Sequence, residues 1–228
     1  MRQRILQQLS IPLLAAAALV LAAVVPAFAE SDPDKLVSRA EATLKDFQND
    51  PQMSWIRDHL GEAKAVMIAP AVRKAGLIIG GSGGRAVLLA RDPVTGSWSG
   101  PAFYTIANAS LGLQAGIEKS EVVMLVMTDK GLTSLLGTQM KLGADASIAA
   151  GPVGAGAGHG ITTDVVSFSR AKGIYGGINL DGTVVKVSGE RNHEYYGQAV
   201  TPTDILVRKT ASSLKSERLL QQIANAAK

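Results

Sequence analysis

The spacing of apolar residues predicts helices near the beginning of the chain and strands through most of the remainder. One set of apolar positions in segment 34–48 recurs at helical spacing within an arc of about 100°, namely Leu36, Val37, Ala40, Leu44 and Phe47. This stripe predicts an amphipathic helix that ends before Pro51, because proline disfavours helical backbone in the residue before it. A second, short helix is predicted over 52–60.

From about residue 63, short apolar runs alternate with glycine and proline, which predicts strands. The expected strands are 65–68, 76–80, 85–91, 103–117, 122–127, 165–170, 173–180 and 183–187. We expect Pro70 to follow the end of the first strand, and Gly81–Gly84 to form a hairpin turn. The glycines at every second position from Gly154 to Gly160 predict a strand with one face free of side chains.

Turn and capping residues divide the second half of the chain. Asp92–Gly96 predicts a turn, and Asp181-Gly182 predicts a hairpin. Thr128 is expected to cap a short helix, and Thr201–Asp204 to begin another. A last helix is predicted over 212–226, with three apolar residues packing inward: Leu214, Leu219 and Ile223.

Together these elements predict a single α+β domain. Its curved, mainly antiparallel, glycine-rich sheet is able to curl into a barrel, and helices flank it at both ends of the domain. The high glycine content, 24 residues, and the low aromatic content fit closely packed strands and turns. We divide the chain into a signal peptide (1–29), N-terminal amphipathic helices (30–62) and a β-rich part with a C-terminal helix (63–228).

The N-terminal segment has the pattern of an export signal. Arg2 and Arg4 precede an apolar run from Leu13 to Val25, and Ala27-Phe28-Ala29 is a small-x-small cleavage site. We expect cleavage after Ala29 and a periplasmic or envelope-associated protein; an uncleaved anchor helix is the alternative. The chain has no cysteine, so neither a lipid-modified N-terminal cysteine nor a disulfide is expected.

Charge argues against nucleic acid as a ligand. The formal charge of +4 includes both arginines of the signal, so cleavage leaves 199 residues with a charge of +2 and interspersed signs. The Gly154–Gly160 run lacks the G-x-G-x-x-G spacing of dinucleotide sites, and no phosphate-binding G-K-[ST] loop is present.

No pattern of catalytic residues is found. The three histidines form no metal-ligand pair, so we expect no metal, no cofactor and no enzyme activity. The segment 191–197 is expected to be an exposed connector whose tyrosines pack on the sheet. A catalytic His193 assisted by a distant aspartate such as Asp164 or Asp204 is an enzymatic alternative, and nothing local supports it.

Binding is therefore the predicted role. The helix 34–48 carries Lys35, Arg39 and Lys45 outside its stripe, but acidic residues alternate with them, which favours packing on the core over insertion in a membrane. Arg73-Lys74 and Arg208-Lys209 are adjacent basic pairs, and two such pairs near one edge could hold an anionic headgroup. The predicted lipid contacts are Lys35, Arg39, Lys45, Trp55, Arg73 and Lys74.

Most of the chain from Ala63 to Leu206 resembles the SYLF domain. The similar blocks are Ala63–Pro70 with Lys74-Ala75-Gly76, Gly80-Gly81 with Gly84-Arg85-Ala86, Trp98–Phe103, Gly112–Gly116, Leu125–Thr128, Gly143–Ser147 with Gly151-Pro152, Tyr175–Ile178 and Tyr195-Tyr196-Gly197. The resemblance implies a lipid-binding module, with actin binding in fungal members. It also implies that an N-terminal amphipathic helix and nearby basic residues bind the lipid.

The signal peptide identifies the chain as an exported bacterial member, so actin is not expected to be its native ligand. The predicted partner is an anionic phospholipid membrane surface. The alternatives are an envelope protein–protein scaffold and, last, a hydrolase. Sequence leaves open whether the 34–48 helix inserts into lipid or packs on the sheet.

Overall fold

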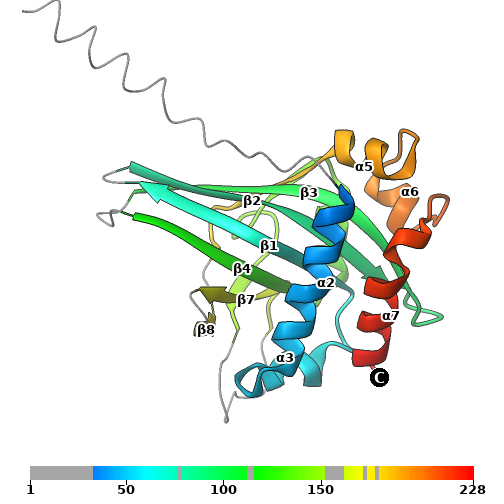
Figure 1. Cartoon of the computed structure of the whole chain (residues 1–228), viewed down its shortest axis with the longest axis horizontal. Coiled ribbons are helices and arrows are strands. Elements are labelled where there is room, and N and C mark those ends of the chain that lie inside the picture. Colours follow the sequence, from blue (N-terminus) through cyan, green and yellow to red (C-terminus); the bar gives the residue numbers. More distant parts are fainter. Residues whose placement is uncertain (1–32, 77–78, 112–115, 152–161, 172–173, 178–179) are drawn as a thin grey trace, which may run out of the picture. The chain divides into compact units, whose positions relative to one another are not determined.

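A computed structural model of the chain describes residues 33–76, 79–111, 116–151, 162–171, 174–177 and 180–228 (Figure 1). The predicted signal peptide and the Gly154–Gly160 strand lie outside the described residues. The helices are α2 (Pro33–Asn49), α3 (Ser54–His59), α4 (Asp129–Leu136), α5 (Gly189–Tyr196), α6 (Pro202–Leu206) and α7 (Glu217–Ala226), with 3₁₀ turns at Pro51–Met53 and Leu214–Ser216.

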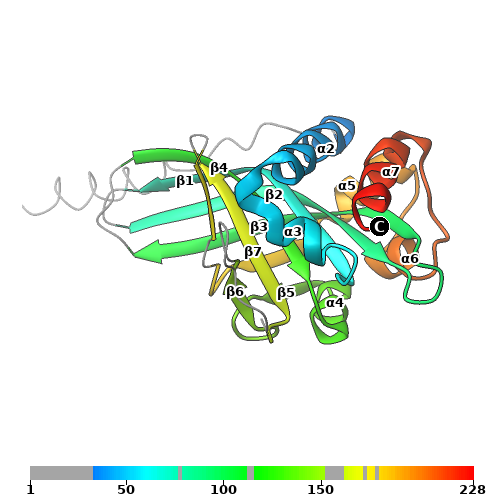
Figure 2. The same ribbon diagram turned by 90° about the horizontal axis from the view of Figure 1, so that it is seen from below.

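The strands form one sheet and confirm the α+β fold. They are β1 (Ala65–Gly76), β2 (Ile79–Arg91), β3 (Trp98–Leu111), β4 (Gly116–Val126), β5 (Gln139–Lys141), β6 (Ile148–Ala150), β7 (Val165–Ala171), β8 (Ile174–Gly177) and β9 (Val184–Val187). Their order is β5-β9-β3-β2-β1-β4-β7-β6, with β8 also paired to β7. The β6–β7 pair is parallel and the other pairs are antiparallel. The sheet curls into a half-barrel (Figure 2).

Apolar residues cover both faces of the central strands. We call the face that carries α2, α3 and α7 the outer face, and the face that packs against α4 and α6 the inner face (Figure 2). Along β4, Val123 and Leu125 join the outer cluster, whereas Val122, Met124 and Val126 join the inner one. An apolar run with little alternation, such as the one in β4, is typical of a strand that is covered on both faces.

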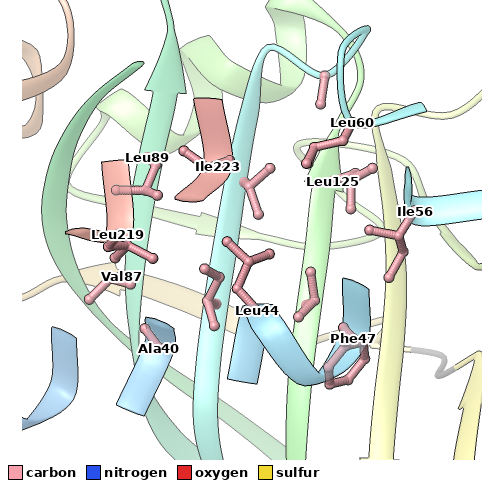
Figure 3. Packing of buried hydrophobic residues seen from close by; sticks show 14 of the residues in the cluster. Ala40, Leu44, Phe47, Ile56, Leu60, Val87, Leu89, Leu125, Leu219 and Ile223 are labelled. Carbon is pink, nitrogen blue, oxygen red and sulfur yellow. The ribbon is translucent and has the colours of Figure 1, made fainter. Parts of the chain in front are cut away.

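The outer cluster is built on the stripe of α2. The helix runs across β2, β1 and β4, and its residues Ala40, Leu44 and Phe47 are fully buried (Figure 3). From the other end of the chain, α7 adds Leu219 and Ile223 to the same cluster. The predicted helix 34–48 is therefore confirmed, and its stripe packs on the sheet.

The glycine run at 81–84 forms part of a strand, contrary to the predicted hairpin turn. β2 continues through it and pairs with β1 on one side and β3 on the other. A Cβ atom at Gly84 would lie 2.5 Å from the carbonyl oxygen of Ala71, so glycine permits a close backbone approach here. The approach occurs where β1 shifts register between Ile68 and Ala71, and this irregularity lets β1 continue through Pro70.

The single strand predicted over 103–117 is two strands. β3 ends at Leu111 and β4 begins at Gly116, and both β2 and β1 lie between them in the sheet. The small residues of this segment are compatible with one long strand and with two strands joined by a turn. The sequence pattern therefore did not indicate that the chain reverses here. The Asp181-Gly182 turn is present, with Gly182 at φ +77°, but it joins β8 to β9, which pair with different strands and form no hairpin.

The predicted caps are confirmed. Thr128 accepts a hydrogen bond from the Gly131 N–H at 3.0 Å, and Thr201 and Asp204 form a reciprocal capping box at the start of α6. Asp92 accepts the N–H groups of its own turn.

Two local predictions near the end of the chain were wrong. Leu214 is 82% exposed, because it lies in the 3₁₀ turn before α7 and only Leu219 and Ile223 face the core. The segment 191–197 falls largely within helix α5, whose buried Asn192 accepts a hydrogen bond from the Phe103 N–H at 2.9 Å. Its two tyrosines do pack, as expected, on the neighbouring apolar cluster.

Candidate binding surface

The polar side of α2 faces away from the core. Lys35, Arg39 and Lys45 are exposed, while the apolar stripe on the opposite side of the helix is buried. The acidic residues between them are partly engaged, since Asp34 accepts a hydrogen bond from Lys215 at 2.8 Å. A ligand that meets this helix therefore meets cationic and polar groups.

An ionic cluster fixes α2 to the strands beneath it. Arg170 on β7 pairs with Asp46 of α2 at 2.7 Å and also with Glu121 of β4. Glu121 in turn accepts a hydrogen bond from the Thr43 hydroxyl at 3.1 Å. The cluster joins α2 to β4 and β7 and fixes the position of the helix over these strands.

Trp55, one of the predicted lipid contacts, lies in the core. Its side chain is 5% exposed, its ring stacks on His59 with centroids 4.0 Å apart, and it also contacts Phe168 of β7. The ring joins α3 to the sheet and is not presented to a ligand.

Arg73 and Lys74 are exposed but lie on opposite faces of the sheet. Side chains alternate along a strand, and Val72, the residue before Arg73, belongs to the inner cluster. Lys74 therefore lies on the inner side, directly opposite Glu118 in register, and Arg73 lies on the outer side with α2. The pair cannot act together on one ligand.

Register brings other cations to the outer face beside Arg73. We call this group the basic floor; its members are Lys141, Lys186, Arg85, Arg73 and Lys119. Arg85 is half-buried and the others are exposed. Sequence analysis missed four of them, because they come from separate strands and only the pairing register reveals that they share a face.

The acid–base candidates serve the fold. Asp164 accepts hydrogen bonds from the Thr128 hydroxyl at 2.5 Å, the Ser147 N–H at 2.8 Å and Lys130 at 3.2 Å. The Thr128 bond foremost, with Ser147 and Lys130 adding to it, holds the pKa of the Asp164 carboxyl well below its ordinary value despite burial. An acid held ionised in this way ties α4 to β7 and is poorly suited to proton transfer.

The other two residues of the enzymatic alternative, His193 and Asp204, are not arranged as an active site either. His193 is exposed on α5, and Asp204 is occupied by the Thr201 cap and by Arg208 at 2.9 Å. Within the described ranges, no group of three or more histidine and acidic side chains could hold a metal ion. Among those same residues, no helix has the length and apolarity needed to cross a bilayer.

A comparison with protein families matches residues 107–226 to Ysc84, described as "Las17-binding protein actin regulator". The chain belongs to the Ysc84 family. This result confirms the resemblance to the SYLF domain, and it places the chain in a family described by binding. No solved structure matches the chain.

The curated relatives that the chain matches include animal and yeast proteins. The chain is 28% identical to the human SH3 domain-containing YSC84-like protein 1 over 71% of its own length and 48% of the relative's. It is 32% identical to LAS seventeen-binding protein 3 of Saccharomyces cerevisiae, over 65% of this chain and 34% of that one. The chain thus spans half or less of the length of these relatives.

Proposed function

We propose that this member of the Ysc84 family is an exported, envelope-associated bacterial protein that binds anionic phospholipid surfaces without catalysis. The observation that carries the proposal is the orientation of α2, which turns Lys35, Arg39 and Lys45 outward while its apolar stripe is buried. Attachment is then electrostatic and superficial. Apolar insertion of the stripe, which the sequence leaves open, would require α2 to leave its place on the sheet.

The expected strength follows from the number of cations. A basic side chain close to an anionic membrane surface contributes about 1 kcal/mol, so the three residues of α2 together contribute about 3 kcal/mol, roughly a hundredfold in affinity. Because the contribution is electrostatic and exposed, it is expected to weaken strongly as salt is raised.

Vesicle sedimentation tests the proposal with the protein cleaved after Ala29. The parent is expected to pellet with phosphatidylcholine vesicles that contain phosphatidylglycerol, and not with phosphatidylcholine alone. The variant K35Q/R39Q/K45Q is expected to lose most of this binding. A control variant, K130Q/R218Q/K228Q, removes the same charge from exposed positions elsewhere and is expected to keep it. Equal loss in both variants, or no sedimentation of the parent, would contradict the proposal.

Export is tested separately. Expression of the full chain in a bacterium and N-terminal sequencing of the periplasmic fraction are expected to give a protein that begins at Glu30. A full-length product retained in the cytoplasm would refute the localisation while leaving the binding proposal open to test.

A protein–protein scaffold is the second candidate. The family description and the yeast relative's name both refer to binding Las17, a protein. For this chain the corresponding partner would be an envelope protein. Affinity capture from an envelope extract that returns one stoichiometric protein, together with no binding to vesicles, would favour the scaffold.

A further inference from the structure

We propose that the basic floor is a docking site for an extended acidic polypeptide segment, distinct from the lipid-facing side of α2. The inference goes beyond membrane binding, because it assigns a second ligand class to the sheet itself. It rests on strand register, on the charge of the outer face and on the position of α2.

Two neighbouring rows of residues cross the outer face. The first contains Gln139, Lys186, Thr105, Arg85 and Ala71, and the second contains Lys141, Val184, Ala107, Gly83, Arg73 and Lys119. Their face is fixed by neighbours in the same strands: Phe103 and Val87 belong to the outer cluster, and each lies two residues from a member of the first row.

The rows are cationic and contain no acidic residue. Their nearest acidic neighbour on β4 is Glu121, which is already engaged by Arg170 and Thr43. Arg73 and Lys119 are direct cross-strand partners, although like charges placed opposite each other destabilise a sheet. The positions between the cations hold small residues: Ala107 is exposed, and Gly83 is buried beneath its neighbours, so no bulky side chain rises between the cations.

The dimensions fit a short extended chain. From β5 to β4 the floor crosses five strand spacings, which at about 4.8 Å each is roughly 24 Å along the curled surface. An extended peptide covers about 3.3 Å per residue, so about seven residues cross the floor. Carboxylates on such a segment suit the exposed Arg73 in particular, since a guanidinium binds a carboxylate in a bidentate manner.

The position of α2 favours a polypeptide over a bilayer. Ala40 of α2 lies over Val87, and Arg85 is the next outward-pointing residue on the same strand, so the floor begins beside the helix (Figure 3). A helix with its side chains is about 10 Å across, so α2 stands above the floor as a step. A flat bilayer resting on the outer side of α2 is held away from the floor, whereas a single extended chain can lie along the base of the step.

Fluorescence anisotropy with fluorescein-labelled octaglutamate tests the site directly, with octaglutamine as the uncharged control. The parent protein, cleaved after Ala29, is expected to bind octaglutamate and not octaglutamine. The variant R73Q/K119Q/K186Q is expected to bind about tenfold more weakly, and the affinity of the parent is expected to fall as salt is raised. The variant K130Q/R218Q/K228Q has the same net charge and is expected to stay within about threefold of the parent.

Two results of the anisotropy experiment would contradict the docking proposal. Failure of the parent to bind octaglutamate overturns it, and so does an equal loss in the two charge-matched variants. Circular dichroism melting curves of all variants are expected to match the parent, since the substituted side chains are exposed.

Vesicle sedimentation of the same proteins separates this site from membrane binding. We expect the floor variant to keep its vesicle binding and K35Q/R39Q/K45Q to keep its octaglutamate binding. If the floor variant loses vesicles but not peptide, the floor is a lipid site and the inference fails. If the α2 variant and the floor variant both keep full vesicle binding while only the floor variant loses octaglutamate binding, the assignment of lipid binding to α2 fails and the inference stands.

Discussion

Truncation of Leu44 tests whether α2 is a fixed part of the fold. Its side chain is fully buried between the helix and the sheet. Replacing a buried leucine with alanine removes apolar contact and leaves a cavity, which together cost about 3 kcal/mol. In a domain of this size each kcal/mol lowers Tm by about 2–4 °C, so Leu44→Ala is expected to lower Tm by about 6–12 °C.

Thermal unfolding followed by circular dichroism measures this effect, with Leu214→Ala as the matched control. Leu214 is 82% exposed, so the same chemical change there is expected to shift Tm by less than about 2 °C. A Leu44→Ala melting curve that overlaps the Leu214→Ala curve would show that the stripe of α2 is not packed in solution, and the reasoning would be refuted.

The same variant distinguishes electrostatic attachment from insertion. Below its Tm, Leu44→Ala is expected to bind anionic vesicles within about twofold of the parent, because Leu44 lies under the helix and contributes no lipid contact. A large loss of vesicle binding by the folded variant would show instead that the stripe enters the bilayer.

Four further substitutions, one of them a control, test other parts of the fold. Asp164→Asn is expected to lower the free energy of unfolding by about 2 kcal/mol at neutral pH, measured by urea unfolding. Because the folded state lowers the pKa of Asp164, this difference in stability is present above about pH 4 and shrinks as the pH falls further. Gly84→Ala is expected to lower stability by about 1–3 kcal/mol because of the Ala71 carbonyl, whereas Gly189→Ala, with nothing within 4 Å, is expected to be neutral or slightly stabilising in the same melting assay. Thr201→Ala removes the α6 cap and is expected to cost about 1 kcal/mol, again read from the melting temperature.

Features encoded within a few residues were predictable from sequence. The stripe of helix 34–48, the Thr201–Asp204 capping box and the Asp92–Gly96 turn each depend on side chains that act on their own neighbourhood. Pattern and structure agree at these places because no distant contact competes with the local preference.

Glycine-rich segments could not be assigned in this way. A run such as Gly81–Gly84 suits a turn and also suits a strand that another backbone approaches closely. The approach here is made by Ala71, at the irregular position next to Pro70, and no neighbouring residue of β2 signals it.

The candidate site was predictable only in part. Exposed cations on α2 follow from the helical period, whereas Trp55 has no local feature that distinguishes a core ring from a membrane contact. Arg73 and Lys74 look like one basic pair, but strand alternation separates them. The cation that joins Arg73, Lys119, lies on another strand, and only the β1–β4 register reveals it.

The position of α7 determines when this protein can fold during synthesis. Leu219 and Ile223 complete the same apolar cluster as α2, and Lys215 binds Asp34 at the start of that helix. Until the ribosome has synthesised the chain as far as Ile223, the side of α2 that contacts α7 stays uncovered. The apolar surface of this layer is therefore accessible to chaperones throughout elongation. Closure of the outer layer is consequently a late event that follows translation of every strand among the described residues.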